Sequence, residues 1–217
     1  MKFLSVTVAA AALLAGIYGA APAARASEAG DILIRGRALI VAPDVGSSLS
    51  LGGAGIPGHT DISTAVVPEL DFSYFFTDSI AAELIAGTTP HNVKATGTPL
   101  GKVDLGNVWL LPPTLTLQYH FMPHEKISPY IGVGVNYTLF YNVDKGDALG
   151  LKYDNTFGYA FQAGVDYKLD DHWSLNLDLK KLMLNTTATV NAGLGTPIKA
   201  DVDINPWLVG VGVGYRF

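Results

Sequence analysis

Histidine, serine and aspartate gather at one point of the chain, where the sequence reads Asp170-Asp171-His172-Trp173-Ser174. A serine activated by a histidine, with a carboxylate orienting the histidine, is the nucleophile of many acyl-transfer enzymes. The two aspartates and the histidine lie in a predicted turn, however, and Ser174 alternates with apolar residues. That alternation places the hydroxyl on the polar face of a strand, away from an apolar acyl substrate. We therefore expect no catalytic site here and no enzymatic activity.

Two histidines could bind a metal ion, because His59 is two residues from Asp61 and His91 lies in a later stretch of the same character. Imidazole and carboxylate groups are both metal ligands, but a stable site usually needs three or four of them. The chain has no cysteine, which excludes disulfide bonds and thiolate ligands. We expect these groups to be solvated, with no bound metal and no cofactor.

Charged residues recur at every second position in several otherwise apolar stretches, as in Arg35-Gly36-Arg37 and Glu69-Leu70-Asp71. The complete set, five residues of each sign, is Arg35, Arg37, Glu69, Asp71, Glu83, Asp166, Lys168, Asp178, Lys180 and Arg216. A charge that is buried away from water must be paired and hydrogen-bonded, and the equal numbers allow each to find a partner. The pattern favours a salt-bridged network over a charge-lined path for ions.

The C-terminal stretch, residues 206–217, shows which elements could hold such charges. One face carries Trp207, Val209, Val211, Val213, Tyr215 and Phe217, and the other carries Leu208, three glycines and Arg216. A period of two is that of a strand. An apolar face with aromatic residues at both ends is typical of a strand that crosses a membrane. Unpaired backbone groups in hydrocarbon cost several kcal/mol each, so such strands must close into a barrel.

Seven further stretches alternate in the same way, which predicts an all-β protein, an eight-stranded antiparallel transmembrane β-barrel. The predicted strands are 32–41, 66–76, 80–88, 108–121, 129–140, 157–169, 173–184 and 206–217. The connections 77–79, 122–128 and 170–172 are short, and 42–65, 89–107, 141–156 and 185–205 are long. Short periplasmic turns and long extracellular loops are the arrangement of bacterial outer-membrane barrels. Aromatic residues at the strand ends, among them Tyr74, Tyr119 and Tyr215, should form a girdle at the periplasmic rim.

The first 26 residues have the pattern of a secretory signal peptide, with Lys2, an apolar run and then Ala24-Arg25-Ala26 before the predicted cleavage site at Ser27. Residues 27–217 then form one domain, the barrel. The charged fraction of 15% is below the roughly 25% of soluble proteins, which disfavours a soluble sandwich or lipocalin-like barrel. The net charge of -5 offers no basic surface to nucleic acid.

Several motifs resemble the outer membrane protein W family, and the resemblance extends over essentially the whole mature chain. They are Leu111-Pro112-Pro113-Thr114-Leu115, Pro129-Tyr130-Ile131-Gly132-Val133-Gly134, Gly164-Val165-Asp166-Tyr167 and Gly214-Tyr215-Arg216-Phe217. The resemblance implies an eight-stranded barrel with a hydrophobic interior channel toward its outer half. It also implies passage or binding of small hydrophobic molecules, and some members serve as phage or bacteriocin receptors.

Inward-facing positions in the predicted outer half of the barrel are less polar than those nearer the periplasm. We expect a hydrophobic lumen lined by Leu33, Leu39, Pro112, Phe140, Leu182 and Leu208. Above a charged network, such a lumen would hold an apolar solute and would not conduct ions. Proline cannot donate to a ladder, so we expect the pairing to be interrupted at Pro112-Pro113. A gap there would let the solute leave sideways into the bilayer.

The sequence therefore predicts a narrow channel or binding site for small hydrophobic molecules, which acts in passive uptake across the outer membrane. The alternative is a structural or receptor barrel with a closed lumen, whose extracellular loops bind a phage, a bacteriocin or a host surface. The expected partners are outer-membrane lipid and lipopolysaccharide, a small hydrophobic solute, and the barrel-assembly machinery, which would contact Phe217. We expect a monomer that binds no nucleic acid.

Overall fold

The computed structural model describes residues 27–217, and the predicted signal peptide, residues 1–26, lies outside the described residues. Eight strands form the barrel: β1 (Ile32–Ala42), β5 (Ala65–Phe75), β6 (Ile80–Ala86), β9 (Thr114–His120), β10 (Ile127–Tyr141), β12 (Thr156–Lys168), β13 (Trp173–Met183) and β16 (Trp207–Arg216). All eight coincide with predicted strands, because each carries the period-two alternation that lipid on one side requires. Within the described residues, no helix is long and apolar enough to cross a membrane.

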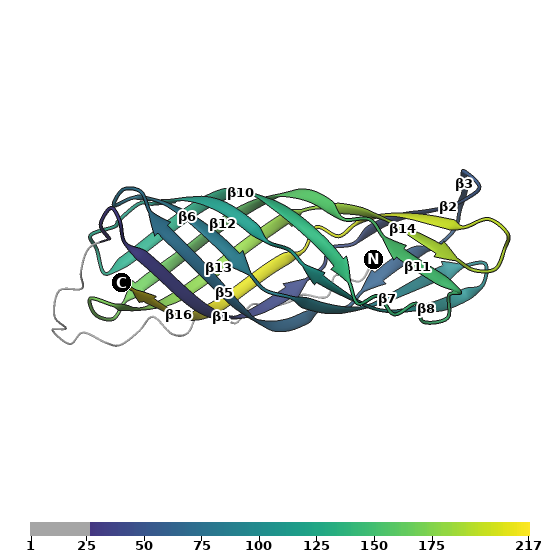
Figure 1. Cartoon of the computed structure of the whole chain (residues 1–217), viewed down its shortest axis with the longest axis horizontal. Helices are drawn as coiled ribbons and strands as arrows, with labels where there is room; N and C mark the ends of the chain where they lie inside the picture. Colours follow the sequence, from purple (N-terminus) through teal and green to yellow (C-terminus); the bar gives the residue numbers. More distant parts are fainter. Residues whose placement is uncertain (1–26) are drawn as a thin grey trace.

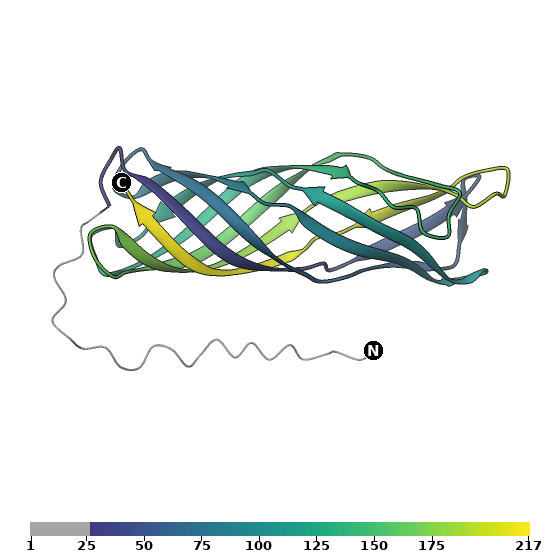
Figure 2. The same cartoon turned by 60° about the horizontal axis from the view of Figure 1, so that its bottom comes forward.

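Pairing of the first and last strands closes the barrel. β16 pairs with β13 on one side and with β1 on the other, and both pairs are antiparallel. The order continues from β1 through β5, β6, β9, β10 and β12 back to β13. Figures 1 and 2 show the tilted strands, with the C-terminus and the start of β1 at the same end, where the turns are short. The predicted closed eight-stranded barrel is confirmed, and both ends of the domain lie at the short-turn end.

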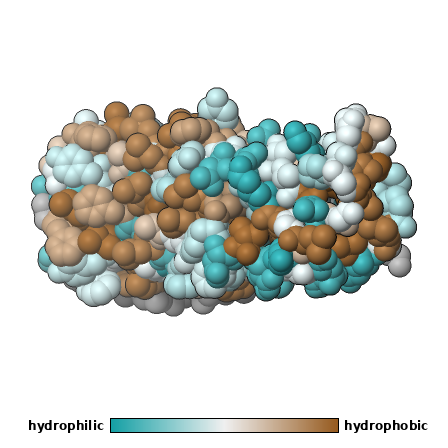
Figure 3. Space-filling view, turned by 45° about the vertical axis from the view of Figure 1, so that its right-hand side comes forward, coloured by the Kyte–Doolittle hydropathy of each residue, from teal (hydrophilic) through white to brown (hydrophobic). Residues whose placement is uncertain are grey.

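The outer surface of the barrel is apolar in the half with the short turns. Leu70 is 58% exposed, Val133 58% and Val211 61%, which would be unusual values for leucine and valine on a surface that faces water. Aromatic rings mark the short-turn rim, where Tyr74 packs against Phe76 and Trp173 against Tyr215. Figure 3 shows this apolar surface in brown over one half of the molecule, with hydrophilic patches over the other. The predicted lipid-facing belt and its aromatic girdle are therefore present.

The four long connections lie at the opposite end, as predicted, but they are not loops. They contain eight further strands: β2 (Gly46–Leu51), β3 (Ala54–Ile56), β4 (His59–Ile62), β7 (Thr89–Thr98), β8 (Gly101–Leu111), β11 (Gly150–Tyr153), β14 (Asn185–Asn191) and β15 (Ile198–Asp203). Five of these form a sheet in the order β11-β14-β15-β2-β3, and β4-β7-β8 join the barrel through β10. The wall of the barrel thus continues well beyond the apolar belt, as the right-hand part of Figure 1 shows.

The two faces of the wall exchange polarity where this extension begins. In β15 the inward residues are Ala200 and Val202, while Lys199 and Asp201 are exposed. In the barrel strands the polar residues are the inward ones. At the boundary, Lys181 of β13 lies opposite Trp207 of β16, with its Nζ 4.8 Å from the centre of the indole ring. The outer half is therefore built like a soluble protein, with water outside and an apolar interior.

Candidate functional site

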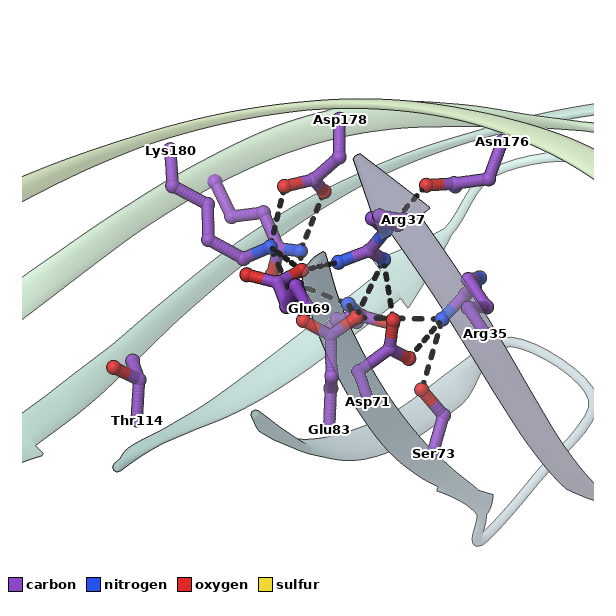
Figure 4. A network of polar contacts seen from close by, with 12 residues as sticks. Arg35, Arg37, Glu69, Asp71, Ser73, Glu83, Thr114, Asn176, Asp178 and Lys180 are labelled. Carbon is purple, nitrogen blue, oxygen red and sulfur yellow. Dashed lines mark hydrogen bonds and ion pairs between the residues drawn. The ribbon is translucent and has the colours of Figure 1, made fainter. Parts of the chain in front are cut away.

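The lumen of the barrel is filled by a network of charged side chains, shown in Figure 4. Arg35 lies at its centre, with Nη1 3.2 Å from Oδ1 of Asp71 and Nη2 2.8 Å from Oδ2 of Asp166. Arg37, two residues along the same strand face, contacts Glu69 at 2.7 Å and Glu83 at 3.2 Å. These side chains are at most 2% exposed, so they leave no water-filled passage around them.

Lys180 forms the end of this network that faces the outer half. Its Nζ contacts Asp178, lies 3.4 Å from Oε1 of Glu83 and is 3.9 Å from Oε1 of Glu69. In Figure 4, Lys180 and Glu69 lie toward the side where Thr114 is drawn, and Arg35 lies toward the other. The network thus joins β1 to β5, β6, β12 and β13 across the lumen.

Neutral polar side chains complete the network, and the sequence analysis did not include them. The Tyr130 hydroxyl donates to Oδ2 of Asp178 at 2.7 Å, and Gln162 donates to the same oxygen at 2.6 Å. Gln118 donates to Glu83 at 2.7 Å. All three occupy inward positions of the alternation, so the same parity argument that found the charges could have found these residues.

Two of the ten predicted network charges lie elsewhere. Lys168 binds the carbonyl oxygen of Pro123, and Arg216 pairs with Asp31 at 3.1 Å, both near the short turns. Each side chain faces inward, as predicted, but its position along the strand places it between the network and the short turns. Five carboxylates therefore meet three cations, an excess of two formal negative charges where the sequence had suggested balance.

An apolar cavity of about 270 Å³ lies directly outward of the network. Glu69 and Lys180 contribute to its floor, and its wall comes from strands of both the barrel and the extension. Five of the six residues predicted to line a hydrophobic lumen line this cavity: Leu39, Pro112, Phe140, Leu182 and Leu208. Leu33 does not, because β1 begins at the short-turn rim, where Leu33 packs with Phe75 and Ala81 below the network.

Most of the upper wall comes from strands in the predicted loops, and these wall residues were not predicted from the sequence. Val93 of β7, Val108 of β8 and Val190 of β14 are buried there. The sign that could have revealed them is alternation of the opposite sense, with alanine or valine inward and threonine, lysine or aspartate outward. Leu49, Leu51 and Ile56, from the first of the predicted long loops, also line the cavity.

Two polar side chains of the outer half also line the cavity. His91 is 3% exposed and donates from Nδ1 to the carbonyl oxygen of Ser63 at 2.7 Å. Burial lowers the pKa of His91 below its usual value, and the hydrogen bond to Ser63 opposes this effect. The ring of Tyr153 stacks on Phe140 with 5.4 Å between the ring centres, and burial raises the pKa of its hydroxyl.

The ladder between β5 and the next two strands is interrupted beside this cavity. β5 pairs with β6 as far as Leu70 opposite Ala86, and within the described chain no ladder pair joins residues 65–69 to residues 87–91. Pro112-Pro113 interrupts the predicted strand 108–121 at the same height, as expected, and separates β8 from β9. Between these prolines and β10 the pairing is nearly continuous. The backbone amide of Tyr137 donates to the carbonyl oxygen of Pro113 at 3.1 Å, and β10 pairs with β9 and β8 on either side of the prolines.

The other candidate groups are not brought together. The exposed ring of His172 stacks on Tyr215 at the rim, and the Ser174 hydroxyl is buried inside without a hydrogen-bond partner among the described residues. His59 and Asp61 are exposed, 3.9 Å apart and both bonded to Thr96. Within residues 27–217, no group of three or more histidine, aspartate or glutamate side chains is arranged to hold a metal ion.

Comparison with known proteins gives consistent matches along the whole domain. The model of the OmpW family matches residues 28–217. The uncharacterized outer-membrane protein y4mB of Sinorhizobium fredii is 49% identical over 75% of this chain and 71% of its own length. Outer membrane protein W of Vibrio cholerae is 34% identical over 88% of this chain and 91% of its own. The crystal structure of OprG from Pseudomonas aeruginosa superposes with a TM-score of 0.84 at 34% identity, over 89% of this chain and 99% of that one.

Proposed function

Because the chain belongs to the OmpW family of outer-membrane β-barrels, we propose that it is a passive conduit for small hydrophobic molecules. The cavity above the charged network is the observation that carries this proposal. Its wall is almost wholly aliphatic and aromatic, and burial of an apolar solute there gains roughly 25 cal/mol for each Å² removed from water. The filled lumen below the cavity supports a site that holds such a solute without conducting ions.

A route out of the cavity is suggested by the interrupted ladder. Val67, Gly87 and Thr89 lie on the two sides of the interruption, and all three line the cavity. Beyond the interruption the outer surface is lipid-facing. We propose that the solute enters from outside, rests above Lys180 and leaves between β5 and the β6–β7 connection. The charged network would then direct movement sideways into the bilayer.

A similar protein adds support to the choice of solute. The dibenzothiophene metabolism operon protein PahQ of Pseudomonas aeruginosa is 30% identical over 82% of this chain and 84% of its own length. Dibenzothiophene is an apolar fused-ring compound. A related function in this chain would suit an apolar cavity.

The proposal is tested by binding of octane to the refolded barrel in lipid nanodiscs, with empty nanodiscs subtracted. We expect saturable binding that is lost when Leu39 and Leu208 are both changed to aspartate, because two charges in the wall make burial of an apolar solute unfavourable. Leu149→Asp, on an exposed residue, is the control for an added charge. Absence of saturable binding to the wild type would refute the proposal and leave the outer hairpins as the functional surface, the receptor alternative.

Two further proposals concern partners. We infer that Phe217 is recognised by the barrel-assembly machinery, because its ring is 61% exposed at the rim while its amide remains bonded to Ile32 at 2.9 Å. We also infer that the barrel acts as a monomer in outer-membrane lipid and lipopolysaccharide. Closure of the barrel supports this, since each of its eight strands, as described in residues 27–217, pairs with a neighbour on both sides and none is left as an open edge strand for a second copy to extend.

A further inference from the structure

The cavity is not uniformly apolar, and its polar atoms differ in how they are satisfied. The Thr114 hydroxyl donates to the Pro112 carbonyl at 2.9 Å, and the Thr186 hydroxyl donates to the Asp154 carbonyl at 2.6 Å. Two buried oxygens of the lining have no hydrogen-bond partner among the described residues, the hydroxyl of Tyr153 and Oε2 of Glu69. Both residues line the cavity, so a polar group on a bound solute lies close to an atom whose hydrogen-bonding capacity is unused.

Glu69 is the stronger of the two recognition points. Its side chain is 1% exposed, and Oε1 accepts from Arg37 at 2.7 Å, which fixes the carboxylate in place. An unsatisfied buried acceptor costs about 1–3 kcal/mol, and more when it is charged. A ligand hydroxyl that donates to Oε2 would remove that cost, which an alkane cannot do.

The charge of the floor decides which head groups can approach it. Lys180 is the other floor residue, but its Nζ is already surrounded by Glu69, Glu83 and Asp178. The network as a whole carries two more carboxylates than cations. A second carboxylate brought by the ligand would be repelled, whereas a neutral donor would be attracted.

We propose that the cavity selects aliphatic amphiphiles with a neutral hydrogen-bond-donating head group, of which primary alcohols are the simplest. The hydroxyl donates to Oε2 of Glu69, and the chain lies outward along Leu39, Leu182 and Leu208. A volume of 270 Å³ is just below the range of about 300–1,000 Å³ that is common for ligand sites, so the chain is short. This inference rests on the proposed function and names the class of solute.

The test compares octanol with octyl methyl ether, which keeps the oxygen and the chain but cannot donate a hydrogen bond. Binding to the full-length mature barrel in nanodiscs is measured by equilibrium dialysis, with empty nanodiscs subtracted. We expect octanol to bind about tenfold more tightly than the ether after correction for their partition into lipid. In Glu69→Gln, Arg37 retains an acceptor, and an amide donor replaces the free carboxylate oxygen. The oxygens of octanol and of the ether can both accept from this donor, so the preference for octanol should be lost.

Glu125→Gln, on an exposed turn, is the matched control and should leave the octanol preference unchanged. Equal binding of octanol and the ether by the wild type would overturn the inference, and this outcome does not depend on whether Glu69→Gln folds. Tighter binding of octanoate than of octanol would also overturn it and assign recognition to Lys180. Saturable octane binding alongside equal octanol and ether binding would leave the proposed function standing while this inference falls.

Discussion

Tyr130 shows how closely residues are fitted inside the barrel. Its ring lies over Gly164 of the neighbouring strand, where an added Cβ would come within 2.4 Å of Cζ and of the hydroxyl oxygen. The hydroxyl donates to Asp178 and accepts from Asn176 at 3.0 Å. The glycine therefore creates the space from which a tyrosine reaches the network.

We expect Gly164→Ala to lower the free energy of unfolding by about 1–3 kcal/mol, because the tyrosine must move and its hydrogen bonds stretch. The measurement is urea unfolding in lipid vesicles, followed by tryptophan fluorescence. Gly36→Ala is the control, since a Cβ at Gly36 meets nothing within 4 Å. A stability equal to that of the control variant would contradict the packing argument.

His91 gives the outer half a dependence on pH. Burial lowers its pKa in the folded protein below the unfolded value of about 6.5. The unfolded state therefore binds the proton more readily, so stability is present above about pH 6.5 and is lost as the pH falls below it. The intrinsic exchange rate slows as the pH falls, so the measured quantity is the protection of the Asn92 amide relative to that rate, and it should decrease between about pH 7 and pH 5. In His91→Gln this decrease should disappear, and in His124→Gln, on an exposed turn, it should remain.

Among the elements, the β6–β7 connection lies beside the proposed exit route. A Cβ at Gly87 would meet the Pro68 carbonyl oxygen at 3.8 Å and Glu69 at 4.0 Å, which is ordinary contact. A Cβ is therefore accommodated at this position, and we expect a larger side chain built on it to lie in the interruption beside β5.

We expect Gly87→Phe to fold, to retain a measurable affinity for octane and to slow the appearance of octane in the lipid of proteoliposomes severalfold. Gly55→Phe, on an outer strand with open space around it, should behave as the wild type. An unchanged rate in Gly87→Phe would rule out this exit route while leaving the binding site intact.

The strands that cross the membrane were predictable because lipid imposes a strict rule on one face. Leu115, Leu117 and Tyr119 of β9 are typical of this rule, and the structure confirms all eight strands. The strands of the extension were not predicted, because water outside permits threonine, asparagine and glycine at outward positions, as in β14. These residue types also occur in loops, so composition alone did not separate the two.

At the scale of the whole molecule, the charged network connects strands that are not neighbours in the barrel. Arg37 of β1 contacts Glu69 of β5 and Glu83 of β6, and it also donates to Asn176 of β13 at 2.7 Å. The period-two alternation of side chains along each strand predicted which charges point inward. It could not predict their height along the barrel, which depends on strand stagger, and so Lys168, Arg216 and Leu33 were assigned to the wrong layer.

Removing one cation should therefore affect the entire barrel. We expect Arg37→Met to lower the free energy of unfolding by about 3–5 kcal/mol, because buried carboxylates lose their partner. Adding Glu69→Gln should restore part of this loss, which a double-mutant cycle would measure as coupling. Lys199→Met, on the outer surface, should have little effect. Additive effects of the two changes would show that the network does not act as a unit.

The outer face of the wall changes from apolar to polar where the extension begins, and this change also fixes how deeply the protein lies in the bilayer. One residue of a strand rises about 3.3 Å, so a sinking of two residues would carry Lys181 and its partner Asp44 into hydrocarbon. Charges on a lipid-facing surface cost up to about 2–4 kcal/mol each at the midplane, and a rise of the same size would expose the aromatic rim to water. The barrel is therefore held at one height in the bilayer, and the interrupted ladder beside β5 lies at a constant level relative to the lipid chains.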